Sequence, residues 1–366
     1  MKKAHRHSQV KMMRRASRVY LNELNAGKAA TVREFLHRCH DAVQYFVDLF
    51  WQREDFSADL ADLDTVHRGR DRFGLTTRLA QALAKQAKEM VRSAQAQGKR
   101  RPKVRQHTVT LYSHFVKLER FDGSFDWAVR LIGSGAPRLV IPAKSTAHLN
   151  RFLADGWPMA KTVRLGRDHR KRLFVEFIVE KRRPPLKTQG STEGMDSNYK
   201  KGVVLSDQQM VGQEGYERIQ TFTKRQKNTK AEIKSLIGHA LKQLDLSGVK
   251  KLCIENLKRV RCGTGGKFPR TLNRRMSHWL YAYIAGWVAR RCEELGVRLE
   301  WKNPAYTSTT CSLCDRCDRR SRVGDRFQCR HCGFSIDADL NAALNLKRLG
   351  EAGVYGLRSL PSWSFV

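Results

Sequence analysis

Acidic residues are scarce in this sequence. The 366 residues include 35 Asp and Glu against 70 Lys and Arg, which gives a formal net charge of +35 at pH 7. So large a basic excess attracts anionic polymers, of which DNA and RNA are the common ones. The composition therefore favours a protein that binds nucleic acid.

Long hydrophobic runs are also missing. No stretch approaches the roughly 20 apolar residues that a membrane span requires. The basic residues run from end to end, whereas a membrane-surface protein usually gathers them beside an apolar anchor. The first residues, MKKAHRHSQVKMMRR, lack the apolar core of a secretory signal. We expect a cytoplasmic protein that associates with the nucleoid through nucleic acid and has no membrane partner.

A disulfide framework is the third feature that the sequence lacks. The chain has nine cysteines, an odd number, and five of them lie between positions 311 and 332. Clustered cysteines without a secretory signal indicate metal binding in a reducing compartment.

The clustered cysteines have the spacing of a zinc site. Two Cys-x-x-Cys pairs supply four thiolates that suit a tetrahedral ion, namely Cys311, Cys314, Cys329 and Cys332. Because four protein ligands leave no open position, we predict a structural Zn²⁺. Cys317 and His331 lie in the same segment, and we interpret them as bystanders.

The pattern of apolar and polar residues changes along the chain. Residues 31–104 have helical periodicity, with Thr31 and Glu34 at capping-box spacing. Residues 105–183 are short β-rich runs between Gly, Pro and Asp, typical of a small barrel or sandwich. After a proline-containing linker at 184–190, strands alternate with helices, which predicts an α/β domain. One of these helices would place Met276, Leu280, Tyr283 and Trp287 on one face.

Three acids stand at the ends of apolar elements in the α/β region. Asp196 lies just before or within a strand, Glu255 ends a strand, and Asp339 opens the last helix. Each alone is more often solvated or paired with a base. Together they suit phosphodiester cleavage by two divalent ions, which needs carboxylates from separate segments. Asp337 is the natural N-cap of the last helix, but both of its aspartates can be structural, and position alone does not choose a ligand.

These motifs resemble TnpB, the transposon-encoded RNA-guided nucleases, and the related type V CRISPR effectors. In the family's order, between residues 191 and 350, the chain carries GMD, IENL, NPAYTSTTCSLC, CRHCG and DADLNAALNL. One departure is Asp315, which stands where the family usually has a glycine after the first cysteine pair.

The resemblance implies an α/β RNase H-like (RuvC-type) nuclease domain with an inserted zinc ribbon. Asp196, Glu255 and Asp339 would then hold two Mg²⁺ ions. It also implies an N-terminal oligonucleotide-binding-like β-barrel that carries a helical recognition insertion. The expected division is 1–30 for the first part of the barrel domain, 31–104 for the helical recognition unit, 105–183 for the remainder of the barrel domain, 184–190 for the linker, 191–303 for the nuclease domain, 304–335 for the zinc ribbon, and 336–366 for the end of the nuclease domain and the C-terminal tail.

The function implied by the resemblance is Mg-dependent cleavage of a target DNA that a guide RNA selects beside a short flanking motif. Four alternatives stay open: a compact type V CRISPR effector, a nuclease-inactive RNA-guided repressor, a zinc-ribbon DNA-binding protein without catalysis, and a strand-transferring transposase. The sequence does not determine the guide, the flanking motif, the number of strands cut or the oligomeric state.

Overall fold

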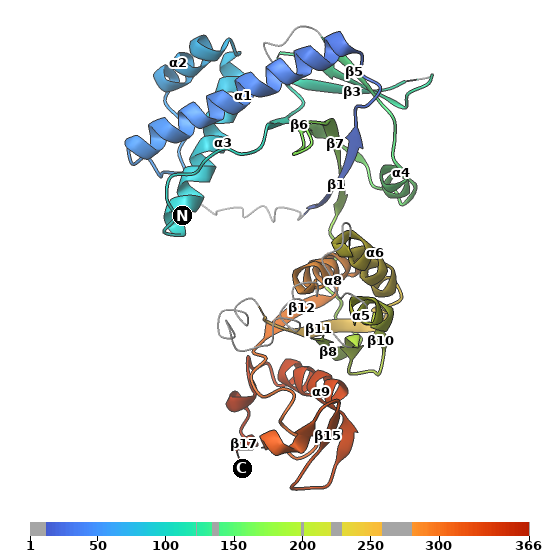
Figure 1. Cartoon of the computed structure of the whole chain (residues 1–366). Helices are drawn as coiled ribbons and strands as arrows, with labels where there is room; N and C mark the ends of the chain where they lie inside the picture. Colours follow the sequence, from blue (N-terminus) through green and yellow to red (C-terminus); the bar gives the residue numbers. More distant parts are fainter. Residues whose placement is uncertain are drawn as a thin grey trace, which may run out of the picture. The chain divides into compact units, whose positions relative to one another are not determined.

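The chain divides into two compact units, Met1–Arg182 and Arg183–Val366. The structure is a computed structural model, and it describes residues 12–121, 123–133, 139–198, 201–220, 229–257 and 280–365. Figure 1 shows the N-terminal unit in blue to green and the C-terminal unit in yellow-green to red. Each unit has its own hydrophobic core, so each is described by itself.

The N-terminal unit contains two antiparallel sheets. One sheet has the order β1 (Met12–Tyr20), β7 (Leu173–Arg182), β6 (Met159–Arg167) and β2 (Thr108–Leu111). The other has the order β3 (Val116–Arg120), β4 (Trp127–Leu131) and β5 (Val140–Ala143). Closure of these sheets into a barrel stays a prediction.

Helices cover the sheets of this unit. They are α1 (Ala26–Gln52), α2 (Leu63–Phe73), α3 (Thr77–Ala96) and α4 (Ala147–Ala154). The capping box expected at Thr31 and Glu34 is wrong. Helix α1 begins earlier, because the side chain of Asn25 accepts a hydrogen bond of 2.8 Å from the backbone N–H of Lys28. Thr31 lies inside the helix, and its hydroxyl donates to the carbonyl of Gly27.

The C-terminal unit is built on a mixed five-stranded sheet. Its order is β10 (Met210–Val211), β9 (Gly202–Leu205), β8 (Ser191–Asn198), β11 (Val249–Glu255) and β12 (Arg298–Lys302). Strands β8, β9 and β10 are antiparallel, whereas β8, β11 and β12 are parallel. The carboxyl ends of β8 and β11 therefore meet at one edge of the sheet.

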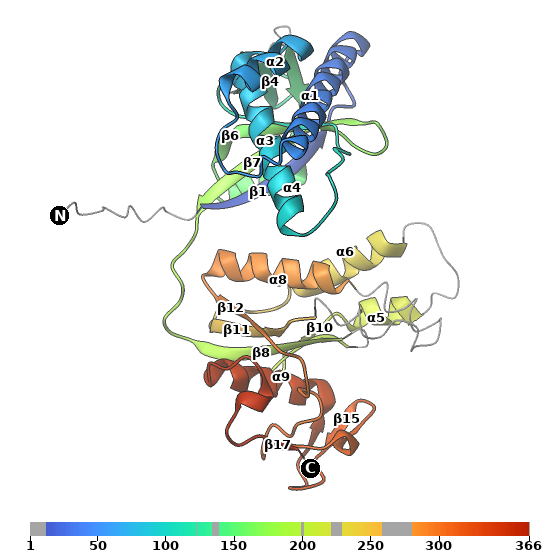
Figure 2. The ribbon, with the colours of Figure 1, turned by 90° about the vertical axis from the view of Figure 1, so that its left-hand side faces the viewer.

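Helices lie on both faces of this sheet (Figure 2). Helices α6 (Thr229–Leu241) and α8 (Tyr281–Leu295) cover one face, and α9 (Ala338–Glu351) covers the other. Helix α5 (Gln213–Gln220) follows β10. Of the apolar face predicted for α8, Leu280 is buried and Tyr283 and Trp287 pack against the core, while Met276 lies outside the described residues.

The segment between β12 and α9 forms small strands around the clustered cysteines. Strands β14 (Arg322–Val323), β15 (Arg326–Gln328) and β16 (Ser335–Asp337) make an antiparallel sheet. Strand β13 (Arg316–Cys317) pairs with β17 (Ser364–Phe365) near the C-terminus. No helix within the described residues combines the length and the apolar character that crossing a membrane requires.

A candidate carboxylate site and a cysteine quartet

Asp196 and Glu255 lie side by side at the carboxyl ends of two parallel strands. In the register of β8 and β11, Met195 is the partner of Ile254, so the following residues, Asp196 and Glu255, are neighbours. Both side chains are buried, at 7% and 9% exposure. The strand pairing thus places two carboxyl groups next to each other, where solvent has little access.

Helix α9 brings Asp339 close enough for its charge to raise the pKa values of Asp196 and Glu255. The side chain of Asp337 caps this helix by accepting from the backbone N–H groups of Asp339 and Leu340, at 3.0 and 3.2 Å. Asp339 is only 2% exposed in the first turn. The helix can lie close to β8 because Gly194 has no side chain: a Cβ there would be 1.9 Å from the carbonyl oxygen of Ala343. The glycine of the GMD motif therefore permits the approach of helix and strand.

The three acids interact electrostatically. Burial raises the pKa of Asp196 well above its ordinary value, and the charges of Glu255 and Asp339 raise it further. Burial also raises the pKa of Glu255 to about 7, although hydrogen bonds from Thr307 and with Asp196 oppose the rise. Burial thus disfavours the ionised forms of both Asp196 and Glu255.

Polar side chains from three other segments contact the acids. The hydroxyl of Thr307 donates to a carboxylate oxygen of Glu255 at 2.9 Å. A guanidinium nitrogen of Arg322 lies 3.4 Å from one oxygen of Asp339, and the ammonium of Lys201 lies 3.6 Å from the other. Lys201 also pairs with the capping residue Asp337. Thr307, Arg322 and Lys201 were not among the predicted site residues. Thr307 lies within the motif NPAYTSTTCSLC, whereas no motif marks Arg322 or Lys201.

The donor set of this cluster fits a hard divalent cation. Its ligand atoms are all carboxylate oxygens, the type that Mg²⁺ takes, and they come from separate elements that hold them in place. Without a cation, burial and mutual repulsion disfavour the charged forms of Asp196 and Glu255. A bound cation would reverse that preference, because it compensates the negative charge.

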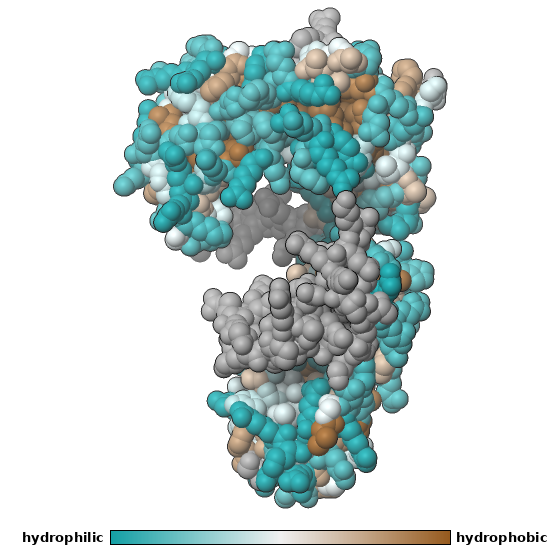
Figure 3. All heavy atoms as spheres, viewed as in Figure 1, coloured by the Kyte–Doolittle hydropathy of each residue, from teal (hydrophilic) through white to brown (hydrophobic). Residues whose placement is uncertain are grey.

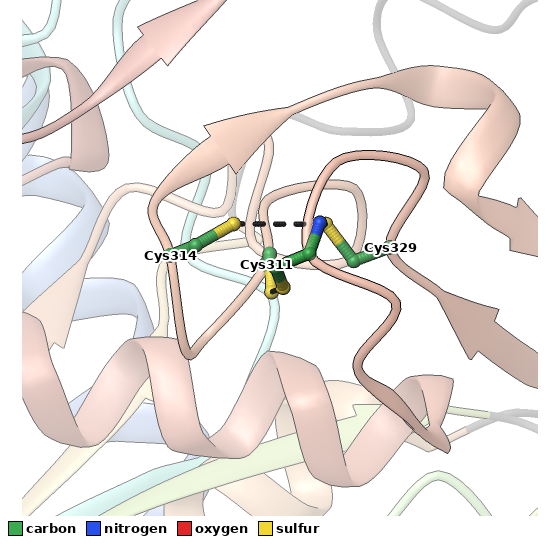
Figure 4. Close-up of side chains that lie close together, drawn as sticks. Cys311, Cys314 and Cys329 are labelled. Carbon is green, nitrogen blue, oxygen red and sulfur yellow. Dashed lines mark hydrogen bonds between the residues drawn. The ribbon is translucent and has the colours of Figure 1, made fainter.

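The four clustered cysteines come together in the structure. Their sulfur atoms all lie within 4.8 Å of one another. The Sγ atoms of Cys311 and Cys332 are 3.7 Å apart, and those of Cys314 and Cys329 are 3.6 Å apart. With a zinc–sulfur bond of about 2.3 Å, a tetrahedron has an edge of about 3.8 Å, so these separations match a zinc site and exclude disulfides. Figure 4 shows Cys311, Cys314 and Cys329 with their side chains converging.

Cys329 has the chemistry of a metal ligand. Burial raises the pKa of its thiol, but hydrogen bonds from the backbone N–H groups of Cys332 and His331 outweigh burial and lower it to about 7. Cys317 is buried outside the quartet, with its sulfur 3.6 Å from the hydroxyl of Thr309. His331 is exposed. Neither residue belongs to the group of four.

Two buried asparagines join the cysteine segment to the acidic helix. The amide of Asn341 donates to the carbonyl of Thr310 at 2.8 Å, and its oxygen accepts from the backbone N–H of Ser312 at 3.0 Å. Asn345, one turn later, donates to the carbonyls of Thr307 and Thr310 at 2.8 Å. The sequence analysis missed these residues. The available signal was a pair of asparagines four apart among apolar residues of a helix.

Asp315 occupies the position where TnpB proteins usually have glycine. Its φ of +63° lies in the left-handed region that glycine favours. Its side chain is 7% exposed and pairs with the guanidinium of Arg348 on α9, at 2.6 Å for the hydrogen-bonded atoms. The ion pair stabilises a conformation that a glycine would adopt without help.

Comparison with known proteins identifies the C-terminal region. Residues 281–346 match the family described as Cas12f1-like, TNB domain. The CRISPR-associated endodeoxyribonuclease Cas12f1 of Sulfoacidibacillus thermotolerans is 36% identical over 75 residues, which cover 20% of this chain and 18% of that protein. A TnpB-like protein of Aquifex aeolicus is 36% identical over 94 residues, 25% of this chain and 30% of that protein. The C-terminal region of this chain is thus similar to Cas12f1 and TnpB-like proteins.

A solved structure extends the likeness to most of the length of this chain. It is the cryo-EM structure of a Cas12f1–sgRNA–target DNA complex, in which the matching chain has a TM-score of 0.51 at 12% identity. The match covers 86% of this chain and 81% of that one, and at this identity it shows a shared fold. The sequence alignments, by contrast, span less than a third of either curated relative.

Proposed function

We propose that this chain is a TnpB-like, RNA-guided, Mg-dependent DNA endonuclease. The observation that carries the proposal is that Asp196, Glu255 and Asp339, three buried acids from separate elements, lie close enough for their charges to interact. The order of the sheet, with three antiparallel strands followed by two parallel ones, supports an RNase H-like (RuvC-type) domain that presents these acids. The names of the Cas12f1 and TnpB-like relatives support the same activity.

The acids would hold the two Mg²⁺ ions through their carboxylate oxygens. Bound Mg²⁺ would supply an activated water and compensate charge on the departing 3′ oxygen. The chain's own residues fix the ligands: the hydroxyl of Thr307 orients Glu255, and the Asp337 cap orients the first turn that carries Asp339. The buried position of the acids keeps bulk water away from the reacting phosphodiester.

The cysteine quartet would hold a structural Zn²⁺, and the surface around it would contact nucleic acid. A hollow of about 730 Å³ on the zinc ribbon is lined by basic side chains, among them Arg316, Arg320, Arg326 and Arg330. Most of the coloured surface visible in Figure 3 is hydrophilic. With a net charge of +35, the chain can neutralise the phosphates of both a guide RNA and a target DNA.

The N-terminal unit would supply the remaining nucleic-acid contacts. Its two antiparallel sheets support an oligonucleotide-binding-like barrel. Helices α1 to α3, which span residues 26–96, support the recognition insertion that we assign to residues 31–104. The further boundaries, a linker at 184–190, a nuclease domain at 191–303 and 336–366, and a zinc ribbon at 304–335, belong to the same proposal. We expect the protein to associate with the nucleoid through its nucleic acids.

Two neighbouring functions give different results in the same assay. A compact type V CRISPR effector would show the same chemistry with a guide transcribed from CRISPR repeats. A nuclease-inactive RNA-guided repressor would bind the matched DNA without cutting it. The buried acid cluster favours the nuclease over the repressor, because a repressor has no need for three desolvated carboxyl groups.

The test is cleavage by the complex as purified. The chain is co-expressed with its native flanking DNA, the copurifying RNA is sequenced, and DNA matched to that RNA is incubated with Mg²⁺. Wild type is expected to cut this DNA, and Asp196→Asn to bind it without cutting. Glu351→Gln is the matched control, since Glu351 is an exposed acid on the helix of Asp339.

Three results would contradict the proposal: no discrete RNA copurifies, matched DNA is not cut by the wild-type complex, or Asp196→Asn cuts as fast as wild type. A guide derived from CRISPR repeats would identify the effector alternative. If the wild-type complex binds matched DNA but does not cut it at any Mg²⁺ concentration, the protein is the repressor.

A further inference from the structure

Three histidines of the N-terminal unit lie together. His37 and His40 are on α1, and His107 directly precedes β2. Each offers a ring nitrogen, and these nitrogens lie within 4.8 Å of one another. The rings of His40 and His107 are stacked, with centroids 4.1 Å apart, and the ring of His37 meets that of His107 edge-on at 5.8 Å.

An acid from the same helix joins the histidines. One carboxylate oxygen of Asp41 is 2.9 Å from Nδ1 of His40, and the other is 3.3 Å from Nδ1 of His37. The spacing of the three residues, i, i+3 and i+4, places them on one face of α1. Asp41 thus contributes a negative charge beside three imidazoles.

The hydrogen bonds of His40 leave Nδ1 facing the carboxylate. Nε2 of His40 lies 2.9 Å from the carbonyl oxygen of Val104, which can only accept, so Nε2 carries the hydrogen. Nδ1 then either carries a second proton, which makes the ring a cation, or presents its lone pair to a bound cation. Histidine ligands of metals usually donate their other N–H to a carbonyl or carboxylate, as Nε2 does to Val104.

The position of His107 is fixed by backbone contacts. Its carbonyl accepts from the backbone N–H of Arg167 at 2.9 Å, which continues the pairing of β2 with β6. Val104, three residues earlier, is held to α1 because its N–H donates to the side chain of Gln44 at 2.8 Å. The segment before β2 therefore runs along the face of α1 that carries His37, His40 and Asp41.

We propose that His37, His40 and His107, with Asp41, bind a divalent transition-metal ion of the Zn²⁺ type. Imidazole nitrogens and one carboxylate oxygen are a common donor set for Zn²⁺, Co²⁺ and Ni²⁺. In a tetrahedral site with metal–nitrogen bonds of about 2.0 Å, the ligand atoms are about 3.4 Å apart. Side-chain rotation closes the difference, and the side chain of His37, 67% exposed, can rotate without backbone movement.

The ion would fasten a basic segment to the helical part of the unit. Residues 99–105 carry five Lys and Arg, and Arg101 already lies 3.4 Å from Asp48 on the same face of α1. A metal that bridges α1 and His107 cross-links positions far apart in the sequence. This function is independent of the nuclease proposal and concerns the other unit of the chain.

The test measures the zinc content of the full-length chain and of its histidine and cysteine variants. After equilibration with ZnCl₂ and removal of free metal, wild type is expected to hold one Zn²⁺ beyond that of the cysteine quartet. The double variant His37→Ala/His107→Gln is expected to lose one equivalent, and so is Cys311→Ser/Cys314→Ser, each independently of the other. His114→Gln, which changes an exposed histidine of the same unit, is the matched control and is expected to retain both.

A spectrum distinguishes the two sites without reference to activity. When CoCl₂ is added to chain whose cysteines already hold Zn²⁺, Co²⁺ at the histidines is expected to give visible d–d bands without thiolate charge-transfer bands. Equal zinc contents for wild type and the histidine double variant would overturn the proposal, as would the absence of those bands from wild type. In that case a second proton on His40 accounts for its contact with Asp41.

Discussion

The cysteine quartet and the carboxylate cluster are both built to suit metal ions, but the chain assembles them in different ways. The four cysteines lie within one short segment whose two Cys-x-x-Cys turns face each other. The Sγ atoms of Cys311 and Cys332 are 3.7 Å apart, and those of Cys314 and Cys329 are 3.6 Å apart. The three acids are distributed from Asp196 to Asp339 and meet only because two strands and a helix pack together. One site depends on local turns, and the other depends on the whole C-terminal unit.

One turn of the chain joins the two sites. Asn341 and Asn345 of the acidic helix hold the turn at residues 307–312, from which both Thr307 and Cys311 extend. Loss of the cysteine site should therefore disturb the carboxylate site through this turn. Loss of a carboxylate should leave the cysteine site intact, since its ligands need no group from the sheet.

The largest expected effect follows from removing a cysteine ligand. Cys329→Ser should lose Zn²⁺ and unfold the ribbon, because structural zinc binding contributes on the order of 10 kcal/mol to folding. Zinc content and protection of strands β14 to β16 from proteolysis measure the effect. Cys317→Ser, a buried cysteine outside the quartet, is the control and should retain zinc; equal zinc loss from both variants would contradict the assignment.

The next effect separates the two aspartates of the DAD motif. Asp339→Asn should lower the rate of DNA cleavage by more than about 100-fold, because it removes a charged ligand from the cation site. Asp337→Asn should cut at close to the wild-type rate, since asparagine caps a helix about as well as aspartate. Single-turnover cleavage of matched DNA measures both, and the opposite order would assign the metal to Asp337.

A pH dependence of stability should follow from the buried acids in the absence of divalent metal. Because burial raises the pKa of Glu255 to about 7, its contribution to stability is present below about pH 4.5 and is lost as the pH rises through 7. The loss is of the order of 3 kcal/mol. Hydrogen exchange of β8 and β11 between pH 5 and 8 measures it.

Two controls isolate this pH dependence. Glu255→Gln should flatten it, and so should Mg²⁺, because each removes the cost of an uncompensated buried charge. If the strands become more stable as the pH rises, the raised pKa of Glu255 does not determine how the stability of this unit depends on pH.

A smaller effect concerns the residue that orients Glu255. Thr307→Val removes the hydroxyl that donates to the Glu255 carboxylate and should slow cleavage about 10- to 100-fold. Thr309→Val, two residues further on the same turn, is the matched control and should have little effect on the rate. Cleavage rates across a Mg²⁺ titration measure the difference, and equal rates would remove Thr307 from the site.

The smallest effect is expected at the position where glycine is usual. Asp315→Gly should change the stability of the ribbon by no more than about 1 kcal/mol, since relief of the left-handed conformation offsets the lost ion pair with Arg348. Arg348→Ala should cost more, because it leaves a buried acid without its partner. Resistance of bound zinc to a chelator ranks the variants, and the reverse ranking would contradict this account.

Much of the cysteine site could be predicted from the sequence alone. Residue type and spacing select the four ligands, since a Cys-x-x-Cys turn forms from neighbouring residues and needs no distant partner. The cap at Asp337 could be predicted for the same reason. The capping box at Thr31 was wrong because a better local cap, Asn25, precedes it and the intervening residues continue the helix.

The carboxylate site could be predicted from the sequence only in part. Sequence identified Asp196, Glu255 and Asp339 as unusual and placed them at element ends, but their proximity depends on strand register and on Gly194 admitting α9. The contacts of Thr307, Arg322 and Lys201 with the acids, and the grouping of His107 with His37, join residues far apart in the chain. The sequence by itself determined the elements, their caps and the cysteine spacing, because those depend on interactions between near neighbours. The tertiary structure decided which distant side chains share a buried space, because only the packing of sheet and helices determines those distances.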